Sequence, residues 1–182
     1  MKKVSMILAD GFEEMEAICT IDILRRAGVR VDIIGLNDTT ITGSHDITLI
    51  ADEKFDYYGV LDYDGIVFAG GMKNAMTLSE NQDILNLINH YNELGKLIAG
   101  ICATPAIVFS KTNILDGKNA TCYPDEELIS KLKNANYVDK CAVVCDNIIT
   151  SQSPYTAMAF GISIASYLGL DVDALQLALK GN

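Results

Sequence analysis

The fold is decided by the stretch LIAGICATPAIV, residues 97–108. Its first five residues form an apolar run with the length of a buried strand. Pro105 suits the first position of a helix, and Thr104 suits the cap before it. Cys102 lies where the strand gives way to the helix. The stretch therefore predicts a tight strand-to-helix turn that carries a thiol.

Strand-like and helix-like segments alternate on both sides of this turn. The expected strands are residues 4–9, 29–36, 65–69, 97–101, 119–122, 141–145 and 147–151. Between the second and third strands, residues 40–56 alternate around turn residues and predict a short antiparallel hairpin at an edge. The whole pattern predicts an α/β fold with a largely parallel sheet, in one domain that covers residues 1–182.

Capping signals set the expected helix boundaries. Asp10, with Glu13 three residues later, predicts the start of the first helix, and Gly28 predicts its end. A helix is expected over residues 81–94, and another after Cys102. Pro124 is expected in the first turn of the next helix. Ser153 predicts the cap of a long helix that reaches about residue 168, and a short terminal helix is expected from residue 171.

The composition excludes several classes of protein. The 182 residues are 49% hydrophobic and carry a net charge of -10 at pH 7, with Lys and Arg scattered, which argues against a nucleic-acid partner. The absence of a long apolar run and of a signal-peptide pattern predicts a cytoplasmic protein without a membrane partner. Five cysteines without CxxC spacing and only two histidines predict neither a disulfide framework nor a metal site.

Four special stretches follow expected strands, where open α/β sheets place their sites: residues 11–16, 70–71, 102–104 and 123–124. The N-terminus of the following helix favours a thiolate, so we expect a lowered pKa at Cys102. The N–H groups of Gly70, Gly71 and Ala103 are candidates for an oxyanion hole. The alternatives are a buried structural cysteine and a plain strand-to-helix turn.

Glu16 is the candidate partner of the thiol because it adjoins the apolar stripe of the first helix. Burial beside Cys102 would raise its pKa and leave a protonated acid that donates a hydrogen bond to sulfur. The neighbouring Glu13 and Glu14 are expected only to complement the helix dipole. His45 and His90 are expected to be surface or structural residues, so no local Cys/His dyad is predicted.

Five stretches, in this order and spacing, resemble the ThiJ/PfpI superfamily in the branch of the parkinsonism-associated protein deglycase. They are LADGFEEMEA at 8–17, IDILRRAGVRVDIIGL at 21–36, IVFAGG at 66–71, LIAGICATPAIV at 97–108 and ITSQSPYTAMAFGISI at 149–164. The resemblance implies a flavodoxin-like sandwich with helices on both faces, usually a homodimer. It also implies a reactive Cys102 on a nucleophile elbow, a protonated Glu16, and amides at Gly71 and Ala103.

Two departures from the family bear on activity. The residue after Cys102 is Ala103 instead of the histidine of proteolytic relatives, so the chain is not expected to be a peptidase. Tyr123 replaces a histidine that precedes the proline matching Pro124. A tyrosine can donate a hydrogen bond, which makes Tyr123 a candidate to bind the substrate, but it is a poor general base at neutral pH. Whether Tyr123 permits catalysis stays open, as does a role for Cys122 as a resolving thiol.

The resemblance implies a cofactor-independent, cysteine-dependent enzyme that acts on a small aldehyde or ketoaldehyde. Glyoxalase-type conversion of methylglyoxal to lactate, or the related deglycase reaction, is the leading hypothesis. The alternative is a redox-sensing or chaperone-like stress protein that acts through oxidation of Cys102. The missing histidine favours this alternative, because sulfur oxidation needs no general base.

Overall fold

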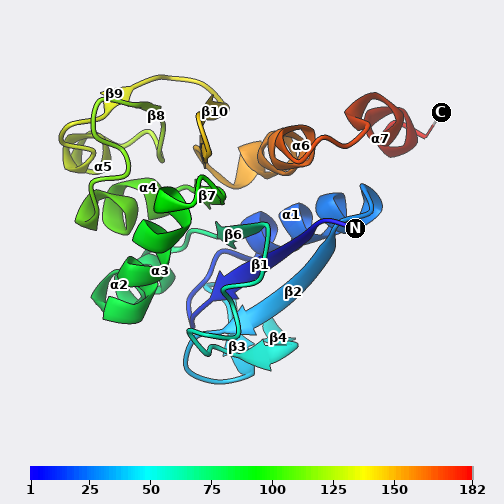
Figure 1. Cartoon of the computed structure of the whole chain (residues 1–182), viewed down its shortest axis with the longest axis horizontal. Coiled ribbons are helices and arrows are strands. Elements are labelled where there is room, and N and C mark those ends of the chain that lie inside the picture. Colours follow the sequence, from blue (N-terminus) through cyan, green and yellow to red (C-terminus); the bar gives the residue numbers. More distant parts are fainter. Residues whose placement is uncertain (182) are drawn as a thin grey trace.

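A seven-stranded sheet forms the centre of the molecule, in the strand order β10-β11-β7-β6-β1-β2-β5 (Figure 1). The computed structural model describes residues 1–181. The strands of this sheet are β1 (Lys3–Leu8), β2 (Arg30–Gly35), β5 (Glu53–Lys54), β6 (Gly65–Phe68), β7 (Leu97–Ile101), β10 (Ala142–Cys145) and β11 (Ile148–Ser151). All neighbours are parallel except β10 and β11, which confirms the predicted largely parallel sheet.

Helices cover both faces of the sheet, and each face has its own apolar core. One face carries α2 (Met72–Glu80), α3 (Gln82–Glu93), α4 (Thr104–Ile107) and α5 (Glu126–Lys131), with the 3-10 turn η1 (Phe109–Lys111) after α4. The other carries α1 (Glu14–Arg26), α6 (Ala157–Tyr167), which follows the 3-10 turn η2 (Pro154–Thr156), and α7 (Val172–Leu179). No helix within residues 1–181 has the length and apolar character needed to cross a bilayer.

Two small sheets complete the fold. The predicted antiparallel hairpin is confirmed as β3 (Thr40–Thr42) and β4 (Thr48–Ile50). The strand expected at 119–122 is only β8 (Asn119–Ala120), and it pairs with β9 (Asn136–Tyr137) outside the main sheet. This corrects the expectation that the segment before Tyr123 belongs to the central sheet. The segment still reaches it, because the N–H of Thr121 donates to Oγ1 of Thr150 on β11 at 2.9 Å.

Several helix starts differ from the sequence expectation. Asp10 does not cap α1; its carboxylate instead accepts the N–H of Thr42 at 3.0 Å, and Glu13 is the N-cap, with its side chain accepting the N–H of Glu16 at 2.8 Å. The reason is Gly11, whose left-handed φ of 81° turns the chain before the helix can begin. Pro124 likewise lies before the α5 cap, which is the next residue in the chain. Helix α2 was not predicted at all.

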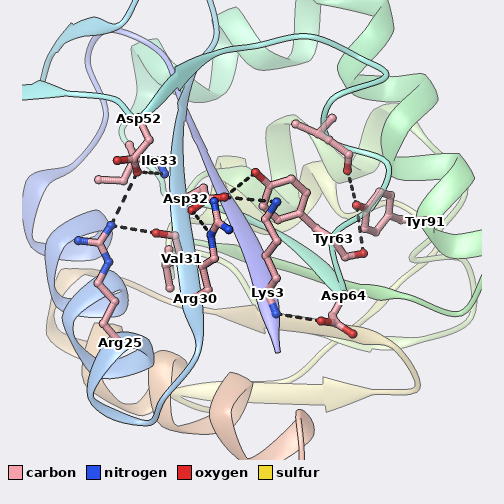
Figure 2. Close-up of polar contacts among 11 residues, drawn as sticks. Lys3, Arg25, Arg30, Val31, Asp32, Ile33, Asp52, Tyr63, Asp64 and Tyr91 are labelled. Carbon is pink, nitrogen blue, oxygen red and sulfur yellow. Dashed lines mark hydrogen bonds and ion pairs between the residues drawn. The ribbon is translucent and has the colours of Figure 1, made fainter. Parts of the chain in front are cut away.

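Charged side chains tie the strands together near the amino ends of β1 and β2 (Figure 2). Asp32 on β2 is nearly buried, and its carboxylate accepts hydrogen bonds from Arg30 Nε at 2.9 Å and from the Tyr63 hydroxyl at 2.8 Å. The Lys3 ammonium lies 3.5 Å from the same carboxylate and over the Tyr63 ring. Asp64, just before β6, accepts the backbone N–H of Lys3 at 2.8 Å. This network fixes the sheet at the end opposite the candidate site.

Candidate active site

Cys102 forms the elbow between β7 and α4. Its φ of 64° is left-handed, a conformation that costs a non-glycine residue free energy and is common at functional sites. Two backbone hydrogen bonds hold it there: its N–H donates to the Ser151 carbonyl, and its carbonyl accepts the N–H of Tyr123, both at 2.9 Å. The predicted strand-to-helix turn with a thiol at its tip is therefore confirmed.

Thr104 does not cap the helix after the elbow, contrary to expectation. The helix already includes it, the N-cap position is Ala103, and no side chain makes a cap hydrogen bond. The Thr104 hydroxyl instead donates to the Ala69 carbonyl at 2.7 Å, which joins the start of α4 to the end of β6. Thr104 therefore brings the elbow and the glycine pair after β6 together.

The two glycines after β6 are required by close packing. A Cβ at Gly70 would lie 2.5 Å from Cβ of Cys102 and 2.5 Å from Oε2 of Glu16. A Cβ at Gly71 would lie 2.2 Å from the Gly11 carbonyl oxygen, and Gly71 has a φ of 87°. Any larger side chain at either position would push apart the segments that surround the thiol.

The N–H groups expected to form an oxyanion hole have different partners. The Gly70 N–H donates to Oε2 of Glu16 at 2.7 Å, so it is engaged by the acid and does not face the sulfur. The backbone N–H groups of Gly71 and Ala103 lower the pKa of Cys102 and so favour its thiolate. The structure thus leaves two backbone donors beside the sulfur instead of three.

Glu16 lies where the sequence places it, fully buried beside Cys102. Burial raises the pKa of its carboxyl to about 8, and the charge of Glu13 adds to this effect; contacts with the Cys102 thiol and the Gly70 N–H oppose it. One oxygen, Oε2, already accepts a hydrogen bond, whereas Oε1 is buried without a hydrogen-bond partner within residues 1–181. A protonated carboxyl is therefore the favoured form at neutral pH.

The expected lowering of the Cys102 pKa is wrong. Burial raises the pKa of the thiol, the Glu16 carboxylate raises it further, and the N–H groups of Gly71 and Ala103 only partly oppose these effects. The physical reason is that α4 is a single turn, so its dipole is weak, while the sulfur is largely withdrawn from water. Cys102 and Glu16 act as a coupled pair that resists carrying two negative charges.

Asn74 supports the site, although the sequence reasoning overlooked it. This fully buried residue in the first turn of α2 donates to the carbonyls of Ala69 and Gly70, both at 3.0 Å, and accepts the N–H of Ala9 at 2.7 Å. It therefore joins the ends of β1 and β6 next to the elbow. The signal in the sequence is a polar amide shortly after a glycine pair that ends a strand.

Tyr123 and Cys122 contribute differently to the elbow. The backbone of Tyr123 holds Cys102, while its side chain is 44% exposed and makes no hydrogen bond within the described residues. Cys122 is fully buried in the core on the α2–α5 face, and its thiol donates to the Tyr123 carbonyl at 3.3 Å. Cys122 therefore faces the core, as strand alternation predicts, and burial raises the pKa of its thiol to about 12.

The histidines lie away from the sulfur. His45, in the hairpin, forms a 2.8 Å ion pair through Nδ1 with the buried Glu14, while His90 lies on α3. Within residues 1–181 no histidine makes a hydrogen bond to Cys102. The only grouping there with metal-ligand spacing is Glu13, Glu14 and His45. These groups already have partners, since Glu13 caps α1 and Glu14 accepts hydrogen bonds from the hairpin.

A known family matches most of this chain. The DJ-1/PfpI family model matches residues 2–167. The chain belongs to the DJ-1/PfpI family. It is 36% identical to Protein dj-1beta of Drosophila melanogaster over 182 residues, which cover 99% of this chain and 96% of that protein. It is also 35% identical to Protein DJ-1 homolog B of Arabidopsis thaliana, over 94% of this chain but only 39% of that longer protein.

Solved structures of relatives have the same fold. Drosophila melanogaster DJ-1beta superimposes with a TM-score of 0.90 at 35% identity, covering 98% of this chain and 97% of that one. Toxoplasma gondii DJ-1, in a form described as oxidized, gives 0.85 at 29% identity and covers 92% of this chain and 91% of that one. The flavodoxin-like sandwich implied by the sequence is confirmed, and the chain is a DJ-1-like protein.

Proposed function

We propose that this DJ-1-like protein is a cofactor-independent enzyme that converts small ketoaldehydes such as methylglyoxal to hydroxy acids such as lactate. One observation carries the proposal: the Cys102 thiol is held in a strained elbow between the buried carboxyl of Glu16 and two backbone N–H groups. A nucleophile, a proton carrier and oxyanion donors are the parts that such a reaction needs. The Cys102 residue is only partly buried.

In the first step, the sulfur attacks the aldehyde carbon. Because burial raises the pKa of Glu16 to about 8, most molecules hold a proton on this carboxyl at pH 7, and a minority carry the negative charge that can remove the thiol proton. Glu16 removes the thiol proton as the new carbon–sulfur bond forms and then passes it to the oxygen, whose developing negative charge is stabilised by the N–H groups of Gly71 and Ala103. The product of this step is a hemithioacetal on Cys102.

In the second step, Glu16 carries a proton between neighbouring carbons. It removes the proton from the carbon bonded to sulfur and returns it to the former ketone carbon, through an enediol. The hydroxyl proton of the hemithioacetal passes to the former ketone oxygen, so the substrate isomerises without a net change in oxidation state. The result is a thioester of the 2-hydroxy acid. Water then breaks the carbon–sulfur bond, which releases lactate and regenerates the thiol. Neither a histidine nor the Tyr123 side chain is required.

The test is turnover of methylglyoxal by wild type, Cys102→Ala and Glu16→Gln, with lactate as the measured product. Cys102→Ala is expected to abolish turnover, and Glu16→Gln to lower it about 10²- to 10⁴-fold, the usual contribution of a general acid–base. Cys141→Ala is the matched control because this cysteine is exposed. Equal turnover by wild type and Cys102→Ala would refute the proposal.

A redox-sensing stress function is the second candidate. The favouring observation is that the two N–H groups that face the sulfur can also stabilise the oxygens of a sulfinate. A relative from Toxoplasma gondii is described as oxidized, which favours this candidate. Peptide mass spectrometry after mild peroxide tests it: oxidation concentrated on Cys102 is expected. Oxidation spread evenly over the five cysteines would contradict it.

We also propose that residues 1–182 act as one domain, in the cytoplasm, as a homodimer. Exposed apolar side chains support self-association, with Met15 and Ile18 on α1 at 61% and 42% exposure and Ile50 on the hairpin at 70%. Sedimentation velocity is expected to give twice the chain mass for wild type and a single chain mass for Met15→Glu. A monomeric wild type would refute the dimer.

A further inference from the structure

A pocket opens between α2, α4 and α5, and its lining is separate from the Cys102 site. Its volume is about 500 Å³, which lies within the range of small-molecule sites. None of Cys102, Glu16 and Tyr123 lines it. The helices that form it lie together on one face of the sheet, whereas α1 and α6 lie on the other (Figure 1). An inference about this pocket is therefore independent of the proposed carbonyl chemistry.

One wall of the pocket is apolar. Met72 and Met76, one turn apart on α2, are 48% and 50% exposed, although methionine usually belongs in a core. Opposite them, Ala106 and Ile107 come from α4. Methionine side chains are flexible and polarisable, so this wall can adapt to an alkyl chain.

The rest of the pocket bears a local excess of positive charge. Lys111, Lys131 and Lys133 line it, against Glu80 and Glu127. Lys131 pairs with Glu127 one turn earlier on α5. The side chains of Lys111 and Lys133 form no ion pair within residues 1–181. These two lysines therefore outnumber the single unpaired acid, Glu80.

We propose that this pocket binds a small amphipathic carboxylate, whose alkyl chain lies on the methionine wall and whose carboxylate pairs with Lys111 and Lys133. Charge complementarity selects a singly charged anion: two unpaired lysines attract it, while the two glutamates of the lining would repel a ligand with several negative charges. The apolar wall selects an alkyl chain over a small polar acid. Each methylene removed from the chain is expected to weaken binding about fourfold.

The experiment is NMR titration of the full chain, labelled with ¹³C at the methionine methyl groups, with decanoate below its micelle concentration. The chain has six methionines, and Met72→Leu and Met76→Leu assign the two signals that matter. Saturable shifts of Met72 and Met76 are expected, with no shift of the core residue Met6. Octanoate is expected to bind about 15-fold more weakly, since it lacks two methylenes.

Charge is tested with ligands and variants. Decanol, which has the chain but no charge, and the double variant Lys111→Gln/Lys133→Gln are each expected to weaken binding at least tenfold. Lys54→Gln is the matched control, because this exposed lysine lies on the edge strand β5 and does not line the pocket. Unsaturable shifts, shifts spread over all methionines, equal binding of decanol, or unchanged binding by the double variant would each overturn the proposal.

Discussion

Replacing Glu16 with glutamine is expected to stabilise the fold relative to wild type, by an amount that grows with pH. In the folded chain the carboxyl holds its proton up to a pKa of about 8, whereas its ordinary value is 4.5. The folded state therefore binds more protons than the unfolded state between these values, and the free energy of unfolding of wild type falls as pH rises through this window. Full stability is present only below about pH 4.5. Glutamine keeps the shape of the neutral acid and cannot ionise.

The magnitude follows from the two pKa values. Each pH unit inside the window costs about 1.36 kcal/mol, and the effect levels off near pH 8. From about pH 5.5 to about pH 7.5, wild type should lose roughly 2 to 3 kcal/mol relative to Glu16→Gln. Cys102 adds little over this range, because burial raises the pKa of its thiol above the ordinary value.

The assay is urea unfolding under reducing conditions at both pH values, for wild type, Glu16→Gln and Glu93→Gln. Glu93 is an exposed residue at the end of α3 and serves as the control for loss of a carboxylate. The difference between Glu16→Gln and wild type should widen by about 2 to 3 kcal/mol, while that of the control stays constant. A difference that does not change with pH would show that Glu16 ionises normally in the fold, and the proton-carrier role would fall with it.

Three further outcomes test other parts of the molecule. Hydrogen bonding to the Glu14 carboxylate, at the start of α1, raises the pKa of His45. His45→Ala should therefore destabilise the chain at about pH 6 and have little effect near pH 9 in urea unfolding. An equal effect at both pH values would contradict this. Gly71→Ala should cost more than about 2 kcal/mol and lower Cys102 alkylation, whereas Gly28→Ala, left-handed but in open space, should cost about 1 kcal/mol. Asp32→Asn should cost about 1 to 3 kcal/mol and the exposed Asp22→Asn less than 0.5 kcal/mol, measured by thermal unfolding; similar costs would refute the structural role of the buried network.

The elbow could be predicted from sequence because its signals are local. An apolar strand, a cysteine and a proline follow one another within LIAGICATPAIV, and the buried position of Glu16 follows from its place beside the apolar stripe of α1. The glycine pair after β6 was also recognised. The contacts of this glycine pair cannot be predicted from local sequence, because Gly70 and Glu16 lie 54 residues apart in the chain.

The missed features depend on tertiary packing. Helix α2 has no side-chain cap, starts after a left-handed glycine, and exposes two methionines, so its sequence resembles a loop. The direction of the Cys102 pKa was wrong because local sequence shows a helix start but shows neither that α4 is one turn long nor how deeply the sulfur lies. Spacing alone predicts a cap at Asp10, because it cannot distinguish the turn imposed by Gly11 from a helix start.

Two main-chain hydrogen bonds of Cys102 link the elbow to β11 and to the segment before α5. Its side chain takes no part in these links, so the chemistry at this point can be exchanged without altering the scaffold. Cys102→Ser, or a selenium analogue of Cys102, would place a different nucleophilic atom beside Glu16 on the same backbone. For protein engineering, the nucleophilic side chain at this position can therefore be replaced while the backbone geometry is kept.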